Sequence, residues 1–153
     1  MSRAFVKETD SETAELLDRP KSPHRNFVTE TGLAAIEAAL KYFEAAYQAA
    51  TGKSDKDGAA AALREVRYWR ARRASAEVLR PGSDKSQVTF GMTVTLRRDD
   101  GREQSFAIVG EDEADPSHGT VSYVSPLARA VLTRGPGERI EIAGREAVIL
   151  DVQ

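Results

Sequence analysis

The side chains of this sequence that are grouped closely enough to bind a cation or a charged partner are carboxylates and arginines. Four acids crowd the short stretch 110–119, which lies between two apolar segments: Glu111, Asp112, Glu113 and Asp115. The stretch lacks the alternating ligands, central glycine and distal glutamate of a calcium-binding loop. The four acids therefore indicate either a solvated loop or a surface that contacts a basic partner.

Two further carboxylates, Asp55 and Asp57, lie in a polar turn between two helical patterns. Carboxylate oxygens are ligands that Mg²⁺ accepts when they are presented with tight geometry. Lys53 and Lys56 lie beside them and partly cancel the negative field that would attract the ion. Asp55 also suits the N-cap of the second helix, a structural role that needs no metal.

Arginine is concentrated in the stretch 62–80, which carries only two glutamates. This pattern indicates either a solvated helix face, whose aliphatic stems cover apolar surface, or a contact with RNA or with an acidic protein surface. The candidates for that contact are Arg64, Arg67, Arg70, Arg72 and Arg73.

Enzyme chemistry has no support in the sequence. The two histidines, His24 and His118, have no further ligand at metal-binding spacing. Phosphate-binding loops, dinucleotide-binding motifs and nucleophile elbows are all missing from the sequence. We therefore expect a protein that is not an enzyme, has no catalytic residues, and holds neither a metal nor a cofactor of its own.

Length and composition fit a protein of one domain or two small ones. The chain has 153 residues, no cysteine, 30% charged residues and a formal net charge of −2. The lack of cysteine rules out disulfides and thiolate metal sites. Because no apolar run approaches the length of a membrane span, we expect a cytoplasmic protein without membrane contact.

The first half of the chain predicts an antiparallel helical hairpin. Residues 1–28 are polar and rich in proline near their end, which indicates an extended or disordered arm. Residues 29–80 then carry two helical patterns joined by the turn at Thr51-Gly52. The first pattern begins after a candidate cap, Thr29, and repeats apolar residues at heptad spacing: Leu33, Ile36, Leu40, Phe43, Tyr47 and Ala50. We place the second helix at about 57–79.

The second half, residues 85–153, predicts an α+β domain after a linker at 81–84. Alternating apolar and polar residues give a strand at 88–96, and Asp99-Asp100-Gly101 is typical of a hairpin turn. Further strands are predicted at 103–109, 120–124, 139–142 and 146–152, which makes an antiparallel sheet with one helix. That helix is placed at 126–134 because Ser125 suits an N-cap and Pro126 suits the first helical position.

Two motifs in the second half carry a family resemblance. The segments IVGEDEADP and VSPLARAVL, in this order and spacing, closely resemble the C-terminal domain of the bacterial transcript-cleavage factors GreA and GreB. The resemblance covers about residues 88–152 and implies a fold like that of FK506-binding proteins. It also implies that the acidic loop and the following helix dock on RNA polymerase, through Glu111, Asp112, Glu113, Asp115, Ser125, Pro126 and Arg129.

The resemblance implies a regulator of transcription elongation that binds bacterial RNA polymerase near its secondary channel. Indirect contact with nucleic acid, including DNA, would then occur within the elongation complex. In that family, two acids at the hairpin tip hold a magnesium ion in the polymerase active site. The turn here does not match the family motif, and the hairpin is expected to be shorter by about 15 Å, or roughly three helical turns. A short-armed relative, the regulator of nucleoside diphosphate kinase, is the closer model.

Two alternatives stay open. The first is a cleavage-stimulating factor that uses Asp55 and Asp57 to share magnesium with the polymerase. The second is a protein-interaction module with no link to polymerase, because a fold by itself does not determine a function.

Overall fold

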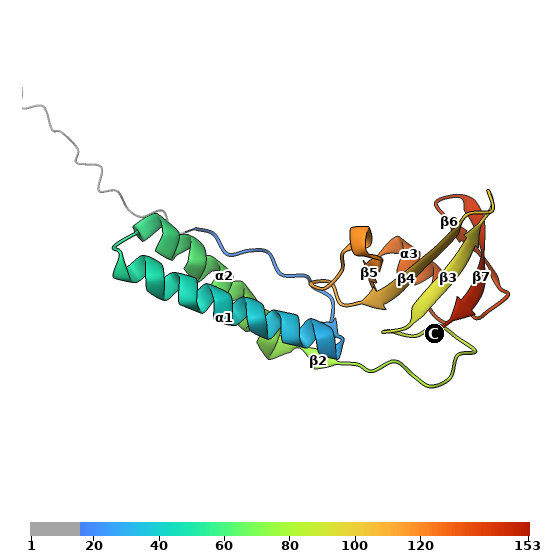
Figure 1. Cartoon of the computed structure of the whole chain (residues 1–153), viewed down its shortest axis with the longest axis horizontal. Coiled ribbons are helices and arrows are strands. Elements are labelled where there is room, and N and C mark those ends of the chain that lie inside the picture. The colour runs from blue at the N-terminus through green and yellow to red at the C-terminus, as the bar shows by residue number, and fades with distance from the viewer. Residues whose placement is uncertain (1–15) are drawn as a thin grey trace, which may run out of the picture.

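The computed structural model describes residues 16–153, which form an elongated molecule with two parts (Figure 1). A helical hairpin occupies one end, and a curled sheet with one short α-helix occupies the other. Residues 16–28 run as an extended segment beside the hairpin and reach the junction of the two parts. The predicted N-terminal arm also included residues 1–15, which lie outside the described residues.

The hairpin consists of α1 (Glu30–Gly52) and α2 (Lys56–Ser75). Both helices begin at side chains that satisfy an otherwise free backbone amide. The Thr29 hydroxyl accepts a hydrogen bond from the amide of Gly32 at 2.9 Å, and Asp55 accepts one from the amide of Gly58 at 3.0 Å. The structure confirms the predicted hairpin and both of its caps.

The seam between the helices is narrow. Ile36 of α1 and Ala62 and Val66 of α2 are buried, whereas the other predicted seam residues of α1 are only half-buried. A two-helix hairpin has no third helix to cover its seam, so most of its apolar side chains keep one side in water.

The second helix ends at Ser75, earlier than the predicted end at residue 79. The chain becomes extended at Ala76, and the amides of Glu77 and Leu79 donate to the carbonyls of Asn26 and Val28 at 2.9 Å each. As a result, β1 (Phe27–Val28) and β2 (Glu77–Val78) form a short parallel pair at the base of the hairpin. The helix therefore ends where the chain pairs with residues 26–28, which lie far away in sequence.

The C-terminal domain is built on a five-stranded sheet in the order β5-β4-β3-β7-β6. Its strands are β3 (Thr93–Arg98), β4 (Glu103–Val109), β5 (Thr120–Ser122), β6 (Arg139–Ile142) and β7 (Arg145–Val152). The α+β class is confirmed, but the antiparallel sheet is wrong at one edge, because β5 pairs with β4 in parallel. A parallel pair needs a connection that returns the chain to the same end. The acidic loop, with the 3₁₀ turn η1 (Pro116–His118), provides that return.

Several predicted boundaries move for local reasons. The first strand begins at Thr93 and not at residue 88, because Gly91 adopts a positive φ of 87° and the Met92 amide turns back to the Thr89 carbonyl. The short helix α3 (Pro126–Val131) stops before the predicted end at residue 134. Thr133 has a φ of 70° and, with Arg134, exchanges backbone hydrogen bonds with Val88.

The apolar core of the molecule lies between the sheet and α3. Its fully buried members include Val94, Leu96, Phe106, Ile108, Val131 and Ile149. Every one of these side chains comes from the predicted strands or from the predicted helix. Within residues 16–153, no helix is long and apolar enough to cross a membrane.

Candidate functional site

The acidic loop holds the two parts of the molecule together. Asp112 accepts a charge-assisted hydrogen bond of 2.5 Å from Nε of Arg72 on α2, and it also accepts one from the Tyr68 hydroxyl. The exposed fractions of the two charged side chains are 4% for Arg72 and 9% for Asp112. The expectation that Asp112 would be exposed is therefore wrong, because its carboxylate is used inside the molecule.

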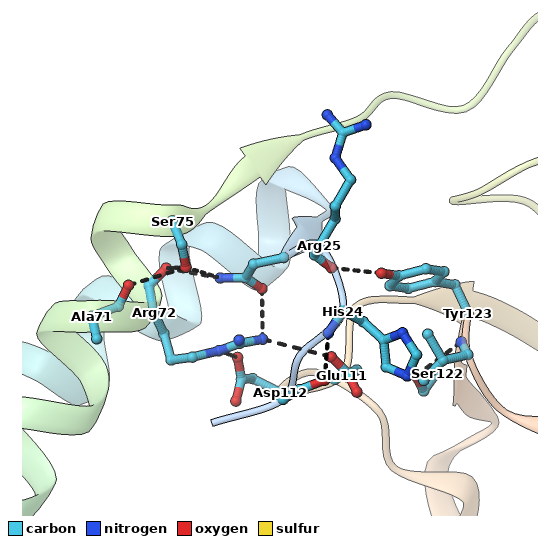
Figure 2. A network of polar contacts seen from close by, with 12 residues as sticks. His24, Arg25, Ala71, Arg72, Ser75, Glu111, Asp112, Ser122 and Tyr123 are labelled. Atoms are coloured by element: carbon cyan, nitrogen blue, oxygen red, sulfur yellow. Dashed lines mark hydrogen bonds and ion pairs between the residues drawn. The ribbon is translucent and has the colours of Figure 1, made fainter. Parts of the chain in front are cut away.

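The neighbouring glutamates also face the hairpin. Glu113 accepts a hydrogen bond of 2.6 Å from the hydroxyl of Thr29, the residue that caps α1. One carboxylate oxygen of Glu111 lies 4.0 Å from Nη2 of Arg72 and is buried without a hydrogen-bond partner in the described residues. Figure 2 marks this pair with a dashed line. Three of the four predicted contact acids thus lie at the junction.

Asp115 is the acid of this loop that remains on the surface. It caps η1 by accepting hydrogen bonds from the amide and the hydroxyl of Ser117, at 3.1 and 2.5 Å. Its second oxygen lies 2.6 Å from Nδ1 of His118. These contacts, the Ser117 hydroxyl first and then His118, lower the pKa of the Asp115 carboxyl.

The other predicted docking residues lie at the start of α3. Ser125 caps the helix by accepting a hydrogen bond of 3.2 Å from the amide of Ala128, as its position predicted. Pro126 and Arg129 are exposed. Together with Asp115, they leave a small polar surface that an external partner can reach.

The tip of the hairpin uses one of its two carboxylates for structure. Asp55 caps α2, and a Cβ atom at Gly58 would contact its carboxylate so closely that the Asp55 side chain would have to shift. Asp57 lies in the first turn of α2 and is exposed, as are Lys53 and Lys56. In the described part of the chain, no group of three or more acidic or histidine side chains is placed to hold a metal ion.

Most arginines of α2 have partners within the chain. Arg70 pairs with Glu44 at 3.2 Å and Arg73 with Glu37 at 2.7 Å, and both pairs bridge to α1. Arg67 pairs with Asp18 at 2.6 Å. Arg64 is half-buried, and its Nε has no hydrogen-bond partner among the described residues. These pairs give the arginines a structural role, and contact with RNA stays a prediction for those that are exposed.

Sequence reasoning missed three residues that complete the junction. Tyr68 stands between Asp112 and the guanidinium of Arg19, which lies 3.7 Å from the centre of its ring. Burial and the hydrogen bond to Asp112 raise the pKa of Tyr68 to about 12. Asn26 exchanges hydrogen bonds with Arg72 from within a segment that was predicted to be an extended or disordered arm. The short apolar pair Phe27-Val28 after the prolines was the one signal that this segment docks.

Comparison with known proteins finds a family model that matches the C-terminal domain. Residues 83–152 match the family model described as transcription elongation factor GreA/GreB, C-terminal. Transcription elongation factor GreB of Neisseria meningitidis serogroup B is 41% identical over 96 residues, which are 59% of this chain and 59% of that protein. Transcription elongation factor GreA of Hyphomonas neptunium is 48% identical over 59 residues, 38% of either chain. The match thus spans about three fifths, or less, of the length of these curated relatives.

Solved structures give a more distant likeness. A structure of the transcription factor Gfh1 is 18% identical and aligns with a TM-score of 0.42 over 85% of this chain and 98% of its own. The elongation factor GreA/GreB of Nitrosomonas europaea is 21% identical, with a TM-score of 0.42 over 84% of this chain and 98% of its own.

Proposed function

We propose that this chain regulates transcription elongation by binding bacterial RNA polymerase near its secondary channel, because residues 83–152 match the model of the GreA/GreB C-terminal domain. The observation that carries the proposal is the order of the parts. A helical hairpin precedes the matched domain and is held to it by the Arg72–Asp112 pair. The domain would dock on the polymerase, and the hairpin would extend from it into the channel.

The docking surface that we propose is smaller than the sequence predicted. Glu111, Asp112 and Glu113 face the hairpin, so they shape the loop and hold the hairpin in place. Asp115 and the exposed start of α3, with Pro126 and Arg129, are left for the polymerase. Charges at the rim of an interface mainly affect the association rate and its dependence on salt.

Strong stimulation of transcript cleavage is not part of the proposal. A second catalytic metal must lie only about 3.5–4 Å from the first, so a carboxylate that stops short contributes nothing. Asp55 is occupied as a helix cap, which leaves Asp57 as the free carboxylate of the tip, next to Lys56. With 23 and 20 residues, the two helices extend only about 35 and 30 Å at the α-helical rise. We therefore propose a factor that occupies the channel without supplying a magnesium ligand.

A binding assay tests the docking part of the proposal. The tagged chain should retain core RNA polymerase, and Arg129→Glu should weaken retention more at low salt than at high salt. Arg102→Glu is the matched control, because Arg102 is an exposed arginine in the turn between β3 and β4. Failure to bind polymerase would leave the chain as an interaction module of another kind.

A cleavage assay tests the second part. Added to a stalled, backtracked complex, the chain should leave RNA cleavage at the intrinsic rate of the polymerase. Asp55→Asn with Asp57→Asn should give the same result. Strong cleavage by the parent chain that disappears in this double variant would establish the cleavage-stimulating alternative, with magnesium shared at the tip.

A further inference from the structure

Residues 16–28, here called the strap, contact the hairpin along α2. Nη1 of Arg19 pairs with Glu65 at 2.7 Å, and the same guanidinium lies 3.7 Å from the centre of the Tyr68 ring. A cation over an aromatic face gains energy in addition to the ion pair. Next to it, Asp18 pairs with Arg67 at 2.6 Å. The first part of the strap is thus attached to α2 by side chains of both charges.

Near its end, the strap reaches the buried arginine of the junction through Asn26. Asn26 has an exposed fraction of 4%, and its amide nitrogen donates to the Arg72 carbonyl at 2.8 Å. Its amide oxygen accepts from Nη2 of Arg72 at 2.7 Å. One guanidinium therefore binds the strap and the acidic loop together, and Figure 2 shows its pair with Asp112.

The end of the strap contacts the C-terminal domain. The Tyr123 hydroxyl donates to the Arg25 carbonyl at 2.5 Å, and the Phe27 ring packs against Tyr123 and Phe90 at centroid distances of 5.3 and 6.2 Å. Gly110 opens the acidic loop, and a Cβ atom there would overlap the Phe27 carbonyl. The strap therefore touches the hairpin on one side and the domain on the other.

We propose that the strap is a clamp that fixes the orientation of the hairpin relative to the C-terminal domain. The side chains of α2 that reach Asp112 are Tyr68 and Arg72, and the strap holds both, through Arg19 and through Asn26. The acidic loop also contacts the hairpin through Glu113, which binds the Thr29 hydroxyl, and through Glu111, which lies near Arg72. The chain itself joins the parts through residues 79–92, which contain no helix or strand. Releasing the strap removes the contact of Arg19 with Tyr68 and that of Asn26 with Arg72. The hairpin can then change its orientation relative to the domain. The clamp is a property of the isolated chain and does not depend on polymerase binding.

Distance measurements between two spin labels test the clamp. The chain has no cysteine, so Lys53→Cys at the tip and Glu146→Cys in β7, both exposed, provide the only attachment sites. We expect one narrow distance distribution in the parent and a broad or divided one in Arg19→Ala with Asn26→Ala. Arg70→Ala is the control, since it removes an exposed ion pair within the hairpin, and it should leave the distribution narrow.

Amide exchange in the same variants reports whether the strap has come away. The amides of Glu77 and Leu79 donate to strap carbonyls and should exchange faster by about tenfold. The size of the effect follows from the hydrogen bond between Asn26 and the charged guanidinium of Arg72, which the double variant removes. The Thr93 amide, bonded to the Gln153 carbonyl, should stay protected and so show that the sheet is intact. If the double variant fails to fold, Arg19→Ala alone is measured, because its side chain is partly exposed. A narrow distribution after the strap has come away, or equal broadening in Arg70→Ala, would overturn the proposal.

Discussion

The hairpin and the C-terminal domain are stabilised in different ways. Buried apolar side chains form a continuous cluster of 13 residues in the domain. In the helices of the hairpin, the buried apolar side chains are Ile36, Ala62 and Val66. The hairpin instead carries ion pairs, most of them between partly exposed groups. Apolar burial contributes far more to stability than surface ion pairs do.

This difference indicates that the hairpin depends on its surroundings. Isolated helices of about 20 residues are marginal in water, and a two-helix seam adds little burial. The Arg72–Asp112 pair, the strap and the β1–β2 pair all attach the base of the hairpin to other parts of the chain. The domain, in contrast, has strands and helix caps of its own.

Separating the hairpin from the C-terminal domain should have the largest effect on folding. Residues 85–153 alone should unfold in one cooperative transition, with a free energy of unfolding of about 5 kcal/mol, typical of their size. Residues 29–80 alone should lose most of their helix. Far-UV circular dichroism of the two fragments during a urea titration measures both. A gradual melt of residues 85–153, or a fully helical hairpin fragment, would contradict the comparison.

Arg72→Ala should have the next largest effect. It leaves the carboxylate of Asp112 and the amide of Asn26 without their buried partner, which should cost about 3 kcal/mol in the free energy of unfolding. Urea titration of the full chain, followed by circular dichroism, measures the change. The matched control is Arg73→Ala, which removes an exposed ion pair and should cost less than about 1 kcal/mol. Equal losses would show that the junction is no more important than the surface of the hairpin.

The ionisation of Tyr68 should make the free energy of unfolding depend on pH at high pH. In the folded chain its pKa is about 12, whereas an unfolded tyrosine titrates near 10. The folded state therefore holds the proton more tightly, so its contribution is complete below pH 10 and is lost as the pH rises to 12. Urea titrations between these limits should show a loss that is smaller in Tyr68→Phe. An identical pH dependence in both proteins would mean that Tyr68 ionises without cost.

The cap at the tip should give the smallest effect. Asp55→Ala removes the hydrogen bond to the Gly58 amide and should destabilise the start of α2 by about 1 kcal/mol. Asp57→Ala, in the first turn of the same helix, should cost only about 0.3–1 kcal/mol through the helix dipole. Amide exchange in the first turn of α2 distinguishes the two. A larger effect of Asp57→Ala would mean that Asp55 is not the structural carboxylate of the tip.

The features that the sequence could predict are local ones. Thr29, Asp55 and Ser125 each cap the helix that follows them, because a cap depends on residues three positions away. The alternation in 88–96 and the turn at Asp99-Asp100-Gly101 likewise predict the β3–β4 hairpin, although the strand begins later, at Thr93.

The features that could not be predicted depend on partners far away in sequence. The parallel pair of β4 and β5, the early end of α2 and the pairing of Arg72 with Asp112 are all of this kind. Asp112 belongs to a motif that predicts contact with another protein, and its sequence neighbours do not reveal that an arginine 40 positions earlier binds it. The same gap explains why the candidate docking surface had to be reduced to Asp115 and the start of α3.

The pairing of Arg72 with Asp112 also limits how freely such modules can be exchanged. A chimaera that joins this C-terminal domain to other helices would bury the Asp112 carboxylate with no cation, unless those helices carry an arginine at the position of Arg72. Asn26 would have to be transplanted as well, because it holds the other side of that guanidinium. The strap, the base of the hairpin and the acidic loop must therefore be exchanged together, both in engineered chimaeras and in natural recombination.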